Sequence, residues 1–149
     1  MQLPERVEPG LVLRYAYLWA EEARAGRDEG IKDRPSVIVL AREIISNSLI
    51  VTVAAITHSP PRSSLGSVEI PAEVKDRLGL DVEASWVVTD ELNTFVWPGP
   101  DLRPIGPRFG EKSDYCFYGV IPNSLLKKVT TEIQKNRASQ RLEVVKRPG

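Results

Sequence analysis

Cysteine and histidine are almost missing from this chain. Cys116 is the only cysteine among the 149 residues, and His58 is the only histidine. A single cysteine excludes an internal disulfide bond, and one cysteine with one histidine cannot form a conventional Cys/His zinc site. We therefore expect no metal centre of that kind and assign no cofactor.

Long apolar runs are also missing. The longest, 49–56, spans eight residues, whereas a membrane-spanning helix needs about 20. The first ten residues, MQLPERVEPG, have no cationic stretch followed by an apolar block and therefore do not form a secretory signal. We expect a cytoplasmic protein that has no contact with a membrane.

Neither sign of charge is in excess, because the formal net charge is zero and gives no general case for a nucleic-acid partner. The distribution is uneven, since 127–149 carries seven Lys or Arg against two Asp or Glu. A basic end on an acidic body can attract phosphates or an acidic partner segment. A solvated helix face followed by a frayed terminus would have the same composition.

The remaining composition is that of one ordinary globular domain, 1–149, with 42% hydrophobic and 27% charged residues. Short apolar or β-branched segments between turn residues predict strands at 11–19, 35–41, 48–57, 66–70, 84–89, 93–97 and 115–121. Helical spacing predicts a short helix at 71–78 and a long one at 122–139, followed by a basic tail at 140–149. This pattern predicts a mainly β fold, a small closed antiparallel barrel with short helices and one C-terminal helix.

The strands 35–41 and 48–57 predict a hairpin whose turn is centred near Ile45 and Ser46. Residues that face each other in an antiparallel hairpin have numbers that add to a constant, here 91. Arg34 and Thr57 fulfil this condition at the open end of the hairpin, so their Cβ atoms should lie about 5 Å apart. A guanidinium and a hydroxyl placed in this way can bind a phosphate. Alternatively, Arg34 pairs with Asp33 or another carboxylate, and Thr57 only ends a strand.

Three blocks together resemble a known family. They are Pro9-Gly10 before the first strand, Arg34-Pro35 before a strand that is followed by one ending in Thr57, and Gly79-Leu80 before SWVVTDELNT at 85–94. Over about 9–97, their order and spacing are similar to the MazF/PemK toxins of bacterial toxin–antitoxin systems. The resemblance implies an SH3-like barrel, a homodimer, a cognate antitoxin protein as partner and single-stranded RNA as substrate.

The resemblance also implies a chemistry, namely metal-independent attack of a ribose 2′-hydroxyl on the adjacent phosphate. The arginine before proline of the family falls on Arg34, and its strand-ending threonine falls on Thr57. Such a reaction needs a base, a proton donor to the leaving oxygen and positive charge on the phosphorane. Arg34 would supply the charge, and Thr57 would hold a nonbridging oxygen.

The chain departs from the family pattern at several positions. The segment 20–33 has no serine, threonine or glutamine, although the family usually carries such residues in this loop. Glu91 replaces a glutamine, and Asn93 stands where a basic residue is common. The expected substrate-binding residues are Trp19, whose ring could stack on a base, and Lys32, Asp90, Glu91 and Asn93.

His58 follows Thr57 directly and is a third catalytic candidate, because histidine exchanges protons near neutral pH. Strand alternation would send its side chain to the face opposite Thr57, unless the chain turns there. The alternative is an exposed loop histidine with no chemical role.

Two alternatives to the endoribonuclease remain open. One is a catalytically silent relative that binds a peptide or protein in the same groove, and the missing loop hydroxyl favours it. The other is a toxin of the same fold that acts on a protein such as a topoisomerase, which the resemblance to CcdB-type toxins suggests.

Overall fold

The structure is a computed structural model, and it describes residues 1–30, 32–43, 47–61, 66–106 and 114–147. Its strands are β1 (Leu11–Tyr15), β2 (Arg34–Glu43), β3 (Leu49–Thr57), β4 (Ser67–Glu69), β5 (Trp86–Val88), β6 (Glu91–Val96), β7 (Phe117–Val120) and β8 (Glu143–Lys146). Its helices are α1 (Ala20–Arg24), α2 (Ala72–Leu78) and α3 (Asn123–Ala138). The mainly β fold with short helices and a long C-terminal helix is confirmed. The predicted turn centre at Ile45 and Ser46 lies outside the described residues.

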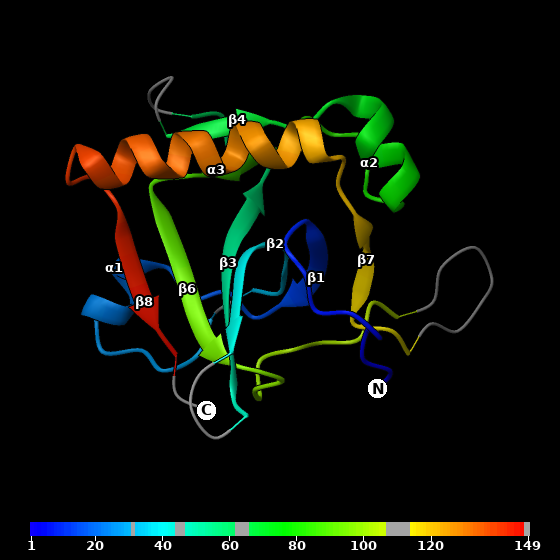
Figure 1. The fold of residues 1–149 in the computed structure, drawn as a ribbon, viewed down its shortest axis with the longest axis horizontal. Coiled ribbons are helices and arrows are strands. Elements are labelled where there is room, and N and C mark those ends of the chain that lie inside the picture. The colour runs from blue at the N-terminus through cyan, green and yellow to red at the C-terminus, as the bar shows by residue number, and fades with distance from the viewer. Residues whose placement is uncertain (31, 44–46, 62–65, 107–113, 148–149) are drawn as a thin grey trace.

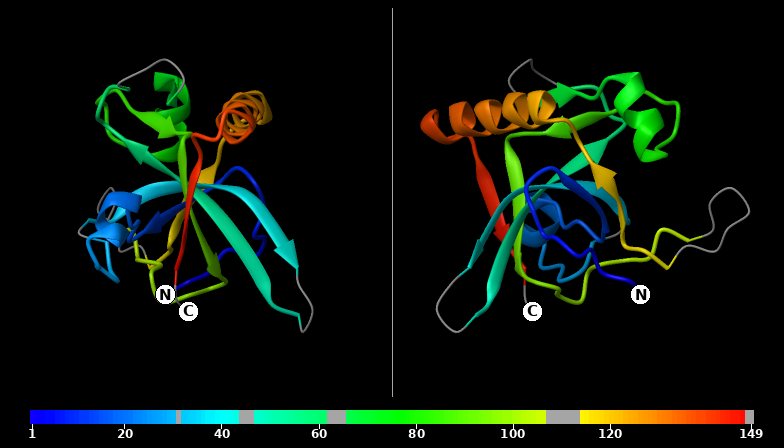
Figure 2. Two further views of the ribbon diagram at one scale, coloured as in Figure 1. Left: turned by 90° about the vertical axis from the view of Figure 1, so that its left-hand side faces the viewer. Right: turned by 45° about the vertical axis from the view of Figure 1, so that its right-hand side comes forward.

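The sheet is strongly bent but open (Figures 1 and 2). Its main path runs β4-β5-β3-β2-β1-β7, and β6 joins β3 and β8 beside this path. The prediction of a closed barrel is therefore wrong for the described part of the chain, since β4 and β7 end the path without pairing with each other. β3 causes the bend, because its residues Ile50–Val53 pair with β6 and Ile56–Thr57 pair with β5. The β2–β3 register also shifts by one residue around Val39, as in a β-bulge.

Two apolar clusters lie on the two faces of the sheet. α3 covers the first cluster with Leu125, Val129 and Ile133, which recur every four residues and are buried on one side of the helix. Burying each such side chain contributes about 1.5–3 kcal/mol. The second cluster contains Tyr15, Tyr17 and Phe95 and lies under the β1–β2 loop.

The predicted basic tail forms a strand in its described part, 140–147. After α3, Gln140 adopts a positive φ of 58°, the chain reverses, and β8 pairs in parallel with β6 (Figure 1). Arg147, directly after β8, is buried. Sequence reasoning missed this strand because four residues between polar neighbours carry only a weak pattern.

None of the helices in the described part of the chain is long and apolar enough to cross a membrane.

Candidate active site

Arg34 and Thr57 occupy the end of the β2–β3 hairpin. The pairs Ser36–Ala55, Val37–Ala54 and Ile38–Val53 confirm the predicted register sum of 91 in this half of the hairpin. The pairing of β2 with β3 ends at Ser36 and Ala55, two residues away from Arg34 along β2 and two residues away from Thr57 along β3. Each strand has a second partner here, because Arg34 pairs with Tyr15 of β1 and Thr57 pairs with Trp86 of β5.

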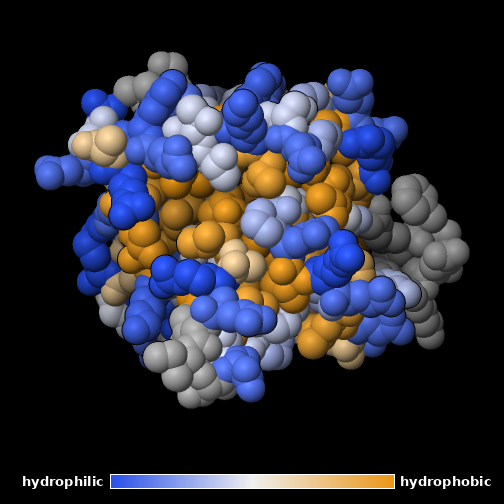
Figure 3. Space-filling model, viewed as in Figure 1, coloured by the Kyte–Doolittle hydropathy of each residue, from blue (hydrophilic) through white to orange (hydrophobic). Residues whose placement is uncertain are grey.

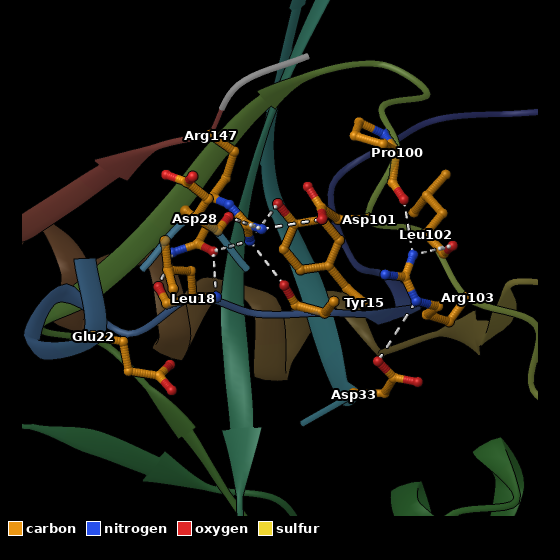
Figure 4. A network of polar contacts seen from close by, with 12 residues as sticks. Tyr15, Leu18, Glu22, Asp28, Asp33, Pro100, Asp101, Leu102, Arg103 and Arg147 are labelled. Carbon is orange, nitrogen blue, oxygen red and sulfur yellow. Dashed lines mark hydrogen bonds and ion pairs between the residues drawn. The ribbon is translucent and has the colours of Figure 1, made fainter. Parts of the chain in front are cut away.

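The Arg34 side chain stacks on an aromatic ring, and one of its nitrogen atoms has no hydrogen-bond partner among the described residues. Its Cζ atom lies 5.1 Å from the centroid of the Trp19 ring, within the range of a cation–π contact. Its Nε is buried and has no hydrogen-bond partner among the described residues. Asp33 does not neutralise Arg34, since its carboxylate faces Arg14 at 3.8 Å. The same carboxylate lies 3.8 Å from Arg103 (Figure 4).

Two hollows share Lys32 and Arg34. One has a volume of about 130 Å³ and is lined in part by Ile56, His58 and Ser85. The other, of about 300 Å³, is lined in part by Tyr17 and Trp19. Lys32 and Arg34 therefore place two cations where the hollows meet, with an aromatic wall on one side and the histidine on the other.

His58 lines the smaller hollow together with Arg34 and Ile56, whereas Thr57, which lies between Ile56 and His58 in the chain, lines neither hollow. The chain turns directly after β3. The Thr57 Oγ1 atom accepts a hydrogen bond of 3.1 Å from the Ser59 N–H, which fixes this turn. The exposed imidazole of His58 contacts Asp81 through Nε2 at 2.8 Å, and its Nδ1 lies 3.5 Å from Glu83.

Asp81 joins His58 to a buried cation. Lys75 of α2 is 4% exposed, and its Nζ lies 3.0 Å from Asp81 Oδ1. Desolvation acts to raise the pKa of Asp81, but the hydrogen bonds from Lys75 and His58 outweigh it and hold that pKa below its usual value. Asp81 is thus an anion that fixes the imidazole through Nε2.

A protein-family comparison matches residues 17–96 to the PemK-like, MazF-like toxin of type II toxin–antitoxin systems. The chain belongs to this family. The comparisons with curated proteins and with solved structures found no match. All eight predicted site residues of this toxin-family member lie inside the matched segment, whereas α3 and β8 lie outside it.

Three predicted substrate-binding residues of the family member do not line the two hollows. Asn93 is fully buried, and its amide makes hydrogen bonds of 2.9 and 2.8 Å with the backbone N–H and carbonyl of Leu18. Asp90 lies directly before β6 and is largely exposed, and partial desolvation of its carboxyl, followed by the charge of Glu143, raises its pKa. The structure therefore gives Asn93 a role in holding the chain before Trp19.

Glu91 is half-buried beside Tyr17. Burial raises the pKa of Glu91 to about 7, although the Tyr17 hydroxyl and the Ala20 N–H favour its charged form. Neither Glu91 Oε2 nor the Tyr17 hydroxyl has a hydrogen-bond partner of good geometry among the described residues. Burial also raises the pKa of Tyr17. The negative charge of an ionised Glu91 is therefore stabilised by few hydrogen bonds, which do not offset the cost of its burial.

Sequence reasoning missed Lys75, Asp81 and Glu83. They lie 17 to 25 positions after His58, on α2 and the loop that follows it, and only the fold brings them to the histidine. Asp81 directly follows the Gly79-Leu80 block, so a polar residue after the helix end was the one available signal. Among the residues that the structure places, no three His, Cys, Asp or Glu side chains are grouped as in a metal site.

Proposed function

We propose that this toxin-family member is an endoribonuclease that cuts single-stranded RNA in the cytoplasm without a metal ion. The observation that carries the proposal is the Arg34 guanidinium, which is stacked on Trp19, lacks an ion-pair partner among the described carboxylates and lies between two hollows with Lys32 and His58. Two cations at the junction of the hollows suit a phosphate with a nucleotide on either side.

In the proposed reaction, the 2′-hydroxyl oxygen forms a bond to phosphorus while its proton passes to a base. The bond from phosphorus to the 5′-oxygen then breaks, and that oxygen takes up a proton. The products are a 2′,3′-cyclic phosphate and a 5′-hydroxyl. Arg34 stabilises the charge of the phosphorane, Thr57 donates its hydroxyl proton to a nonbridging oxygen, and His58 exchanges the proton with the reacting oxygens.

Asp81 has a positioning role in this proposal. Its contact of 2.8 Å with His58 Nε2 holds one ring nitrogen and leaves the other, Nδ1, facing Glu83. Glu83, which lies 3.5 Å from Nδ1, is exposed and can move when RNA enters. A ring fixed through one nitrogen and open at the other is suited to proton exchange.

Protein partners form a second part of the proposal. A cognate antitoxin would neutralise the toxin, and two copies would associate through the apolar face that lies below α3 across β8, β6 and β3 (Figure 3). Leu40 and Val144 are about half exposed. In a two-fold dimer the same surface of both copies meets, so the apolar face of one copy would pack on the apolar face of the other. Leu40→Glu should convert the dimer to a monomer in sedimentation, whereas Val82→Glu, at a fully exposed loop position, should not.

The activity is tested by incubating purified protein with a long single-stranded transcript in EDTA. Cleavage should persist, and a kinase should label the product 5′-ends without prior dephosphorylation. Arg34→Ala should abolish cleavage, while Arg42→Ala, which removes an exposed cation from the other end of β2, should not. Cleavage that stops with EDTA and returns with Mg²⁺ would overturn the mechanism. No cleavage of any RNA by folded protein would favour a silent, protein-binding relative.

A further inference from the structure

Arg147 is a charged residue with 4% of its surface exposed, located directly after β8. Its guanidinium points into the space between the β1–β2 loop and the segment after β6 (Figure 4). The Nη2 atom lies 3.0 Å from Asp101 Oδ1, which neutralises the charge. The Nη1 atom donates to the Ala16 carbonyl at 2.8 Å and to Asn93 Oδ1 at 3.2 Å.

One of these contacts leads to the proposed active site. Asn93, which accepts from Arg147, holds both backbone polar groups of Leu18. The next residue is Trp19, whose ring stacks on Arg34. A continuous series of contacts thus connects Arg147 to the Arg34 guanidinium through Asn93, Leu18 and Trp19.

The β1–β2 loop is held from its other side as well. Arg147 Nη2 lies 3.4 Å from the carbonyl of Asp28, and Arg24 of α1 forms an ion pair with Glu143 of β8. The segment 143–147 is itself fixed by its parallel pairing with β6. The β1–β2 loop is therefore attached to β8 at α1, at Asp28 and, through Asn93, at Leu18.

We propose that Arg147 is a positioning residue for the Arg34 site and that 143–147 is an intramolecular clamp on the β1–β2 loop. The inference rests on the proposed endoribonuclease function. Without the guanidinium, the buried Asp101 carboxylate and one Asn93 acceptor lose a partner, so the segments that they join separate. Trp19 then moves, and a displacement of about 1 Å at a group that stabilises the transition state can lower the rate about 10²-fold.

The test uses the full chain with Arg147→Met combined with Asp101→Asn, which removes the ion pair without leaving a buried charge. Arg147→Lys is a second variant, because it keeps the charge but cannot span all the acceptors. Lys146→Met is the matched control, since it removes the neighbouring exposed cation. Circular dichroism confirms folding, and all measurements are made well below the melting temperature.

Two kinds of readout distinguish positioning from a loss of stability. In protein labelled with 5-fluorotryptophan, the ¹⁹F resonance of Trp19 should shift in the double variant while that of Trp86 stays. Amide exchange over 20–30 should become faster. With RNA, kcat should fall about 10- to 100-fold and KM should change less than about threefold. Arg147→Lys should show the same changes with a smaller loss, and Lys146→Met should show none.

The clamp is overturned if kcat stays at the parent value in the folded Arg147 variants, or if kcat falls while the Trp19 resonance and the exchange are unchanged. If the double variant does not fold, the kcat, the Trp19 resonance and the amide exchange of Arg147→Lys decide whether the clamp exists. If the parent protein cleaves no RNA, the proposed function fails, and the Trp19 shift and the exchange alone decide whether the clamp exists.

Discussion

The guanidinium of Arg34 lies on the ring of Trp19, 5.1 Å from its centroid, in a site where no carboxylate of the described residues forms an ion pair with it. The ring limits the orientation of the guanidinium plane. Because Asp33 is occupied by Arg14 and Arg103, the positive charge of Arg34 remains free for a ligand. Trp19 packs against the second apolar cluster, so this cluster supports the ring that holds the Arg34 guanidinium at the proposed active site.

The first prediction concerns this pair. Arg34→Ala should lower the cleavage rate about 10²- to 10³-fold, as the loss of one oxyanion donor does, and Arg34→Lys should restore little because a point charge cannot replace the planar fork. Trp19→Ala should lower the rate about 2- to 30-fold, which corresponds to a cation–π energy of about 0.5–2 kcal/mol. Trp19→Phe should lower it less. Single-turnover cleavage of one short RNA measures all four, and equal rates for Trp19→Ala and the parent would contradict the role of the ring.

The second prediction separates the hydroxyl of Thr57 from its packing. Thr57→Ser keeps the hydroxyl and should retain most of the activity. Thr57→Ala removes one hydrogen bond to a charged group, worth about 1.5–3 kcal/mol, and should lower the rate about 10- to 100-fold. Because Thr57 Oγ1 also accepts from the Ser59 N–H, the fold of each variant is checked by its melting temperature. If serine and alanine lower the rate equally, the hydroxyl is not used.

The third prediction concerns His58 and the residue that orients it. His58→Ala should lower kcat about 10²- to 10⁴-fold and remove one limb of its pH profile, as expected for a residue that transfers the proton. Asp81→Asn should lower kcat about tenfold, because it weakens the hydrogen bond to His58, worth about 1–1.5 kcal/mol. The change also removes the charged partner of the buried Lys75, so the fold of this variant is checked by its melting temperature. Asp76→Asn, an exposed carboxylate on α2, serves as the control. Near-parent activity and an unchanged pH profile in His58→Ala would assign this histidine to the loop alone.

How much of the fold could be predicted depended on the range of the interactions. The β2–β3 register followed from chain arithmetic, because a hairpin is a local structure whose two strands are joined by a short turn. α2 and its end at Gly79, which adopts a left-handed φ of 70°, followed equally from local signals. The β-bulge at Val39 has no composition signal in this strand, and the bend of β3 between β6 and β5 depends on pairings with distant segments.

The candidate site divides in the same way. Arg34 and Thr57 could be found from the hairpin and the family resemblance, whereas the contact of His58 with Asp81 spans 23 positions. The sequence marks Asn93 as a candidate residue but gives no sign of its burial. The contact with Arg147, which lies 54 positions later in the chain, arises only in the fold. A charged residue near the end of a chain is usually exposed, so its composition gives no sign that it is buried in an ion pair.

The last prediction concerns Glu91, whose pKa rises from its ordinary value of 4.5 to about 7 because the carboxyl is partly buried. The folded protein therefore retains this proton over a pH range in which the unfolded chain has lost it. The free energy of unfolding should fall as the pH rises between 4.5 and 7, and the whole loss should be present at higher pH.

Glu91→Gln carries no charge to ionise and has nearly the same shape. It should raise the free energy of unfolding at pH 8 by about 1–2 kcal/mol, a value reduced for the partial exposure of the carboxyl, and should have little effect near pH 4.5. Urea denaturation at both pH values measures the difference, with Glu21→Gln on the exposed side of α1 as the control. If Glu91→Gln raised the free energy of unfolding equally at both pH values, or did not raise it at pH 8, the ionised carboxylate of Glu91 would not destabilise the folded protein.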